Sequence, residues 1–280
     1  MPDLRFLLKV SRPRFWFYVF GPNLVGLAAG IASRNDLADW RFALFGLYFL
    51  LPANLLVYGI NDIFDYETDS LNEKKTVYET LVGPEHRRRL FFWIAALNLP
   101  FIILAAVLFD ARSFAALQTF IFLSIFYSSP PIRAKTKPVL DSAFNVLYVM
   151  PGAFAYGISA GELPPTMLIV AGGLWTAAMH AYSAIPDIEA DRKAGLNTIA
   201  TFFGPYGTLA ICFFLYAGSA VLSLEYLGFA SLTLGSAYLL LMLASVYSVK
   251  TGRLFKLYRA FPFINVAAGF IIFWQIALSK

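Results

Sequence analysis

Three acidic residues with helical spacing close a long apolar stretch of this sequence. Asp62, Asp65 and Asp69 stand at positions i, i+3 and i+7 of that stretch. At about 100° per residue, this spacing puts the three carboxylates on one face of a helix. Tyr58 and Asn54, earlier in the same stretch, fall on the same face. One helix end is therefore expected to carry three acids, a phenol and an amide.

The chemistry of this face points to a bound cation. Carboxylates that share a face repel by up to about 4 kcal/mol per close pair at an effective dielectric constant near 20. The donors are oxygen atoms without histidine or cysteine, a set typical of a hard cation such as Mg²⁺ or Ca²⁺. Mg²⁺ in particular is commonly held by a few carboxylates together with substrate phosphates. The alternative is an acidic helix end that water solvates.

A second acidic stretch follows another apolar run. Asp187 and Asp191 lie one helical turn apart on one face, and His180 precedes Asp187 by two turns. Pro186 removes a backbone hydrogen bond and can kink the helix, so the place of His180 depends on whether the helix continues. Two acid clusters at corresponding ends of two apolar helices predict one divalent-metal site that binds a diphosphate.

The composition is that of a membrane protein. Of the 280 residues, 59% are hydrophobic, 17% are aromatic and only 14% are charged. This apolar content exceeds that of ordinary soluble domains. The single cysteine, Cys212, lies in an apolar run, which excludes a disulfide framework and a thiolate metal site.

Nine apolar segments are long enough to predict membrane spans. We therefore expect an all-α fold, a polytopic bundle of nine transmembrane helices that forms a single domain over residues 1–280. The segments lie near Phe15–Ala32, Phe42–Ile60, Leu90–Leu108, Phe114–Ser129, Val139–Ser159, Met167–Pro186, Tyr206–Tyr226, Ala230–Val249 and Phe261–Ser279.

Basic residues are distributed unevenly between the two sides that these spans define. All Lys and Arg, including Arg12 of the N-terminal arm, fall on one side except Arg34, Arg41, Arg112 and Lys280. Basic residues concentrate in cytoplasmic loops of membrane proteins. The N-terminus and both acid clusters are therefore predicted to face the cytoplasm, across a membrane that we expect to be a prokaryotic inner membrane. This topology explains the net charge of +5 without nucleic acid as a partner.

Cations and a phenol follow the apolar runs next to the acids. Arg and Lys here could neutralise diphosphate oxygens, Arg through two parallel hydrogen bonds and Lys as a point charge. The alternative is that they only anchor the orientation in the membrane. The residues are Tyr127, Arg133, Lys135, Arg192 and Lys193. The cytoplasmic loops at about 70–89, 130–138 and 187–204 are expected to cover the site as lids.

Taken together, the two acidic stretches resemble the motifs of the UbiA superfamily of intramembrane prenyltransferases. Residues 61–69 match the superfamily pattern NDxxDxxxD, and residues 187–191 match DxxxD. Nine spans and cytoplasmic motifs agree with this resemblance. It implies that Mg²⁺ ions bridge a prenyl diphosphate to Asn61, Asp62, Asp65, Asp69, Asp187 and Asp191. It also implies roles for a Tyr and a Lys after the fourth span, best matched by Tyr127 and by Lys135 or Lys137.

Within the superfamily, three stretches are similar to lycopene elongases, which prenylate the ends of carotenoids. They are residues 57–62, 180–187 and 191–196. This branch implies an acceptor without charge, such as lycopene. An aromatic quinone precursor or a tetrapyrrole is the alternative acceptor.

We thus predict a Mg²⁺-dependent enzyme that transfers a prenyl group from an allylic prenyl diphosphate to a hydrophobic acceptor in the lipid bilayer. The predicted catalytic residues are Asp62, Asp65, Asp187 and Asp191. The predicted substrate-binding residues are Asn54, Tyr58, Asn61, Tyr127, Arg133, Lys135, His180, Arg192 and Lys193. A lipid or ion transporter is the alternative from another class, but such proteins often carry their charges near the membrane midplane.

Overall fold

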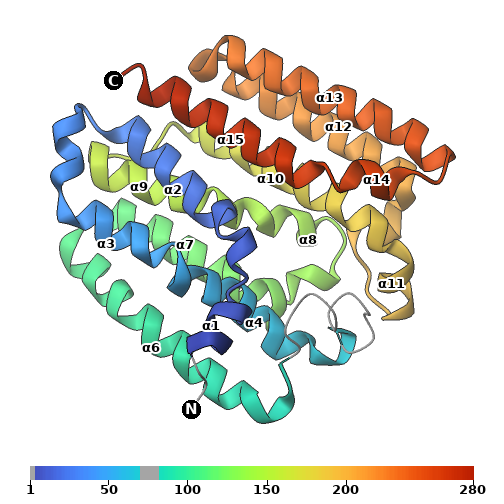
Figure 1. Cartoon of the computed structure of the whole chain (residues 1–280), viewed down its shortest axis with the longest axis horizontal. Helices are drawn as coiled ribbons and strands as arrows, with labels where there is room; N and C mark the ends of the chain where they lie inside the picture. The colour runs from blue at the N-terminus through green and yellow to red at the C-terminus, as the bar shows by residue number, and fades with distance from the viewer. Residues whose placement is uncertain (1–3, 70–81) are drawn as a thin grey trace. The chain divides into compact units, whose positions relative to one another are not determined.

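The computed structural model describes residues 4–69 and 82–280, with side chains from 4–66 and 82–280 (Figure 1). Every regular element in these ranges is helical, which confirms the all-α prediction. The α-helices are α1 (Leu4–Val10), α2 (Phe17–Gly30), α3 (Trp40–Tyr48), α4 (Leu51–Asp69), α6 (Pro84–Leu108), α7 (Ala111–Ser128), α8 (Leu140–Ala143), α9 (Met150–Ala160), α10 (Thr166–Ala184), α11 (Ile188–Lys193), α12 (Ile199–Leu227), α13 (Phe229–Lys250), α14 (Leu254–Tyr258) and α15 (Phe261–Ala277). Short 3₁₀ helices are η1 (Pro13–Phe15), η2 (Arg34–Ala38), η3 (Ala134–Thr136), η4 (Phe144–Tyr148) and η5 (Ile185–Asp187).

Seven helical stretches in the described residues are long and apolar enough to cross a membrane. They coincide with seven of the nine predicted spans. The other two predicted spans form α2, which is only 14 residues long, and α7, whose polar residues include Arg112 and Gln118. The chain is therefore an integral, multi-pass membrane protein, and the count of nine spans stays a prediction.

The chain folds as two compact units. The first unit contains Met1–Arg133 and Met150–Leu163 together with Lys280, and the second contains Ala134–Val149 and Pro164–Ser279. Each unit holds one of the two acid clusters. The single domain over residues 1–280 stays a prediction, and so do the lid loops, the first of which lies largely outside the described residues.

An aromatic core holds the helices of the first unit together. The ring of Phe154 on α9 lies 5.0 Å from that of Phe45 on α3 and 5.8 Å from that of Phe49, measured between centroids. All three side chains are fully buried. On α4, Gly59 leaves the space that the Ile94 side chain of α6 fills. This packing fixes the helix that carries the first acid cluster.

In the second unit, α10 is held by neighbours on several sides. The thiol of Cys212 on α12 is buried and donates to the carbonyl of Ala178 at 3.5 Å. The hydroxyls of Tyr182 and Ser245 lie 3.0 Å apart and join α10 to α13. Since α10 leads into η5 and α11, these contacts position the second acid cluster.

Candidate active site

The first acid cluster lies on a buried face of α4. Asp62 and Asp65 are 4% and 2% exposed, whereas Phe64 between them is exposed. This confirms the shared face that the helical spacing predicts. The amide of Asn61 donates to the hydroxyl of Ser128 at 3.0 Å, which ties the start of the motif to α7. The side chain of Asp69 lies outside the described residues.

A cation from the N-terminal arm lies against this acidic face. The Nη2 atom of Arg12 is 2.6 Å from Oδ1 of Asp62, and both side chains are largely buried. The same guanidinium stacks over the ring of Tyr58, 4.9 Å from its centroid. Arg12 reaches this place from the turn between α1 and η1, where its backbone adopts φ +52°. Sequence reasoning treated Arg12 only as part of the basic N-terminal arm.

Asn54, which is predicted to bind substrate, forms hydrogen bonds with the backbone at a break in its own span. The predicted span is interrupted between the end of α3 at Tyr48 and the start of α4 at Leu51. The amide of Asn54 donates to the carbonyls of Phe49 and Leu50 at 3.0 and 2.6 Å. Asn54 is fully buried. In the structure it satisfies backbone groups that the break leaves open, and its contact with substrate stays a prediction.

The second acid cluster follows a change of helix type. α10 ends at Ala184, η5 contains Pro186 and ends at Asp187, and α11 carries Asp191. The helix that carries His180, α10, therefore does not continue regularly to Asp187, because the tighter 3₁₀ turn of η5 changes the angle between residues. Asp187 and Asp191 still lie close enough for their charges to repel.

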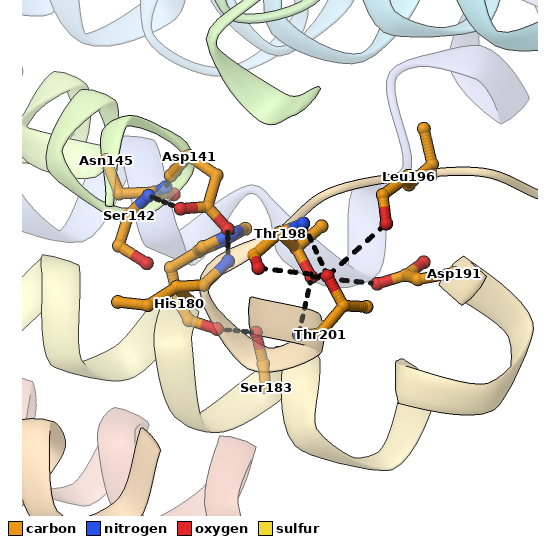
Figure 2. A network of polar contacts seen from close by, with 10 residues as sticks. Asp141, Ser142, Asn145, His180, Ser183, Asp191, Leu196, Thr198 and Thr201 are labelled. Atoms are coloured by element: carbon orange, nitrogen blue, oxygen red, sulfur yellow. Dashed lines mark hydrogen bonds and ion pairs between the residues drawn. The ribbon is translucent and has the colours of Figure 1, made fainter. Parts of the chain in front are cut away.

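Residues at and before the start of α12 form hydrogen bonds with Asp191 of α11. Thr198, the N-cap residue of α12, donates from Oγ1 to Oδ2 of Asp191 at 3.4 Å (Figure 2). The N–H of Leu196 donates to the backbone carbonyl of Asp191 at 2.8 Å. Lys135 in η3 interacts with the Asp191 carboxylate electrostatically. The loop between α11 and α12 therefore folds back, so that its residues contact the helix that carries Asp191.

A buried acid that the motifs did not reveal lies in the same unit. Asp141 on α8 is fully buried, and its carboxylate accepts hydrogen bonds from the N–H groups of Ser142 and Ile199, both at 2.8 Å (Figure 2). Nε2 of His180 lies 3.8 Å from Oδ2 of Asp141. The signal available in the sequence was a lone acid inside a predicted span, which is costly unless it has partners.

The remaining candidate cations differ in burial. Lys135 is half-buried, whereas Lys137, Arg192 and Lys193 are exposed. The guanidinium of Arg192 donates to the carbonyl of Thr201 at 3.4 Å. Tyr127 lies on α7 and Arg133 follows it, both in the first unit. The charge of Lys135 acts on Asp191 of the second acid cluster.

The residues present fit a hard divalent cation by donor chemistry. Both clusters offer carboxylate oxygens, and the first adds the amide oxygen of Asn61. The buried Asp62 already has a cationic neighbour in Arg12, so this face attracts positive charge. Among the described side chains, three or more His, Cys, Asp or Glu residues do not gather at one point. Each cluster offers oxygen ligands of the kind that Mg²⁺ prefers, and the metal site that they are predicted to form stays a prediction.

Comparisons with known proteins all indicate the same family for this chain. The sequence pattern described as the UbiA prenyltransferase family matches residues 19–277. A lycopene elongase/hydratase of Halobacterium salinarum is 39% identical over 95% of this chain and 95% of its own length. One from Corynebacterium glutamicum is 32% identical over 79% of this chain and 77% of its own. The structure of a UbiA homologue from Archaeoglobus fulgidus bound to DMAPP and Mg²⁺ superposes with a TM-score of 0.69, at 23% identity over 95% of this chain and 98% of that one.

Proposed function

Because this chain belongs to the UbiA prenyltransferase family, and is therefore a membrane enzyme that transfers prenyl groups, we propose that its acceptor is a carotenoid of the lycopene type. The observation that carries the proposal is the 39% identity to the H. salinarum lycopene elongase/hydratase over 95% of both chains. The relative from C. glutamicum, which has the same name, supports the same acceptor. The proposed donor is dimethylallyl diphosphate, supported by the similar fold of the homologue bound to DMAPP and Mg²⁺.

The proposed cofactor is Mg²⁺. When bound, it would supply Lewis-acid stabilisation of the negative charge that forms on the leaving diphosphate. The support from this chain is a set of oxygen-only donors, one of which, Asp62, is a buried carboxylate with a cation beside it. The residues proposed to hold the metal are Asn61, Asp62, Asp65, Asp69, Asp187 and Asp191.

Basic side chains of this chain neutralise the same diphosphate. Preorganised cations are most effective where charge develops during the reaction. Lys135 is the better candidate than Lys137, because Lys135 is half-buried and interacts with Asp191, whereas Lys137 is exposed. Tyr127, Arg133, Arg192 and Lys193 complete the proposed diphosphate-binding set.

An apolar polyene suits the acceptor side of the reaction. Burial alone can hold it, at about 25 cal/mol per Å². An aromatic acid would instead need a buried cation as partner. On the buried face of α4, the cation Arg12 already pairs with Asp62. Asn54, Tyr58 and His180 are the proposed contacts of the hydrocarbon substrates.

In the proposed reaction, a terminal double bond of the carotenoid attacks the allylic carbon of the donor. The bond between that carbon and the diphosphate oxygen breaks, a carbon–carbon bond forms, and the diphosphate leaves with the electron pair. The cation on the carotenoid then adds water and releases a proton, or it loses a proton directly. The site is proposed to open to the cytoplasm, with the N-terminus on the same side of a prokaryotic inner membrane.

Expression in cells that make lycopene tests this acceptor. We expect carotenoids extended by one or two five-carbon units, detected by chromatography and mass spectrometry. Asp62→Ala should lower their yield by at least about 100-fold, because substitutions near a metal commonly cost 10- to 100-fold and this one removes a proposed ligand. Asp65→Ala and Asp187→Ala should behave alike. Glu162→Ala, a change at an exposed acid in the loop between α9 and α10 and outside both motifs, is the matched control and should keep the pigments.

The acceptor proposal is wrong if lycopene is unchanged while 4-hydroxybenzoate or another aromatic acid is prenylated by the same membranes. Extended carotenoids formed equally well by Asp62→Ala, Asp65→Ala and Asp187→Ala at saturating Mg²⁺ would contradict the metal site instead.

A further inference from the structure

The start of α12 receives two carboxylates from different parts of the second unit. One belongs to Asp141 of α8, whose Oδ2 accepts the N–H of Ile199, the first residue of α12. The other belongs to Asp191 of α11, whose Oδ2 accepts the hydroxyl of Thr198, the N-cap residue. The first N–H groups of a helix lack partners within the helix, so a carboxylate or a hydroxyl satisfies them. The first segment of α12 is short, because Gly204 interrupts the helix with φ +68°.

The Asp141 carboxylate is bound firmly. It is fully buried, and its other oxygen accepts the N–H of Ser142 at 2.8 Å. A buried carboxylate is costly unless it is paired or hydrogen-bonded, so the bond to Ile199 holds α8 and the start of α12 together. The two residues are separated by 58 positions in the sequence.

Thr198 connects the hydrogen bond between Asp141 and Ile199 to the second acid cluster. Its backbone N–H donates to Oγ1 of Thr201 at 2.8 Å, and the N–H of Thr201 donates back to Oγ1 of Thr198 at 3.3 Å (Figure 2). This reciprocal capping fixes the N-cap side chain. The hydroxyl that faces Asp191 therefore has its position set by the same turn that Asp141 holds.

We propose that Asp141 is a positioning residue for Asp191 and acts through the first turn of α12. The inference rests on the proposed metal and diphosphate site, because it assigns Asp141 the task of orienting one of the metal ligands. Residues that orient metal ligands through hydrogen bonds typically change metal affinity by 10- to 100-fold when they are replaced.

The test measures Mg²⁺ response rather than turnover. The full-length protein is purified in detergent with dimethylallyl diphosphate at a fixed concentration, and Mg²⁺ is titrated while the thermal unfolding midpoint is recorded. The readout is the Mg²⁺ concentration that gives half of the ligand-induced rise. Asp141→Asn and Thr198→Val should each raise this concentration about 10-fold. Thr198→Ser, which keeps the hydroxyl, should leave it within about twofold of the parent.

The double variant and a second helix cap separate positioning from general stability. Asp141→Asn combined with Thr198→Val should shift the Mg²⁺ response no further than the larger single change, because both act on one network. Asp110 is the matched control, since its carboxylate accepts the N–H groups of Arg112 and Ser113 at the start of α7 in the first unit. Asp110→Asn should leave the Mg²⁺ response unchanged even if it lowers the unfolding midpoint.

The proposal is overturned if Asp141→Asn lowers the unfolding midpoint but leaves the half-saturating Mg²⁺ concentration unchanged, as Asp110→Asn does. If Asp141→Asn fails to fold, the pair Thr198→Val and Thr198→Ser decides, and equal responses of the two overturn it. A normal Mg²⁺ response in Asp187→Ala would instead remove the proposed metal site, and this inference with it.

Discussion

The ion pair between Arg12 and Asp62 places a positive side chain on the acidic face of α4. Removing one partner of a buried pair leaves the other charge with less compensation, at a cost of about 3–5 kcal/mol. Both side chains are largely buried, so this range applies to them. We expect Arg12→Gln to destabilise the metal-free protein by about 3 kcal/mol. The thermal unfolding midpoint in detergent should fall accordingly.

Adding Mg²⁺ with dimethylallyl diphosphate should reduce the difference in unfolding midpoint between Arg12→Gln and the parent. The reason is that cations proposed to bind Asp62 would compensate its charge in place of Arg12. Arg34→Gln, at an exposed arginine of η2, is the control and should have little effect. Equal midpoints for Arg12→Gln and the parent, without Mg²⁺, would show that the pair contributes nothing.

Spacing predicts residues that act within one helix but not their partners from elsewhere. The shared face of Asp62 and Asp65 follows from the helical period alone. The neighbour of Asp62 is 50 positions away, and the backbone donor to Asp141 is 58 positions away. No local pattern encodes such pairs, since they depend on how helices pack. This is why the sequence did not single out Arg12 as the partner of Asp62, or Asp141 as the partner of Ile199.

At the scale of elements, apolar runs predicted the helices better than their interruptions. The span near Phe42–Ile60 contains a break between α3 and α4, and the span near Val139–Ser159 is divided into α8, η4 and α9. Both breaks lie inside stretches that are apolar enough on average to cross a membrane, so hydropathy alone does not locate them. Asn54 in the first was a usable signal, because a buried amide commonly satisfies backbone groups. Pro186, by contrast, correctly predicted the disturbance that η5 shows.

Close packing of α2 against α9 depends on glycine. A Cβ atom added to Gly26 would collide with the backbone of Gly152, which cannot move as a flexible side chain can. We expect Gly26→Ala to destabilise the protein by about 1–3 kcal/mol, the usual cost of overpacking. The thermal unfolding midpoint in detergent measures this effect.

Gly269→Ala on α15 is the matched control, because nothing lies within 4 Å of its added Cβ atom. Alanine favours a helix interior over glycine by about 1 kcal/mol, so this control should be neutral or slightly stabilising. If Gly26→Ala were as stable as Gly269→Ala, α2 and α9 would not pack as closely as the structure indicates.

At the scale of the molecule, composition and charge specified the class of protein. The high apolar content predicted an integral membrane protein, and seven helices of sufficient length and hydropathy in the described residues agree with it. The pair of acidic motifs was sufficient to indicate the family, which the match over residues 19–277 confirms. The acceptor was harder to predict, because an apolar ligand is recognised by shape and area rather than by a few polar residues.

Orientation in the membrane is the remaining molecular property that the sequence predicts. Basic residues concentrate on the cytoplasmic side, and the asymmetry predicts that the start of α6 lies in the cytoplasm and η2 on the opposite side. Glu85→Cys and Asn35→Cys introduce thiols at exposed positions of these two elements. The native Cys212 is buried and should react slowly. In intact cells, a membrane-impermeant maleimide should label Asn35→Cys but not Glu85→Cys, and both should react after the cells are opened. Labelling of both from outside would contradict the predicted topology and the cytoplasmic opening of the proposed site.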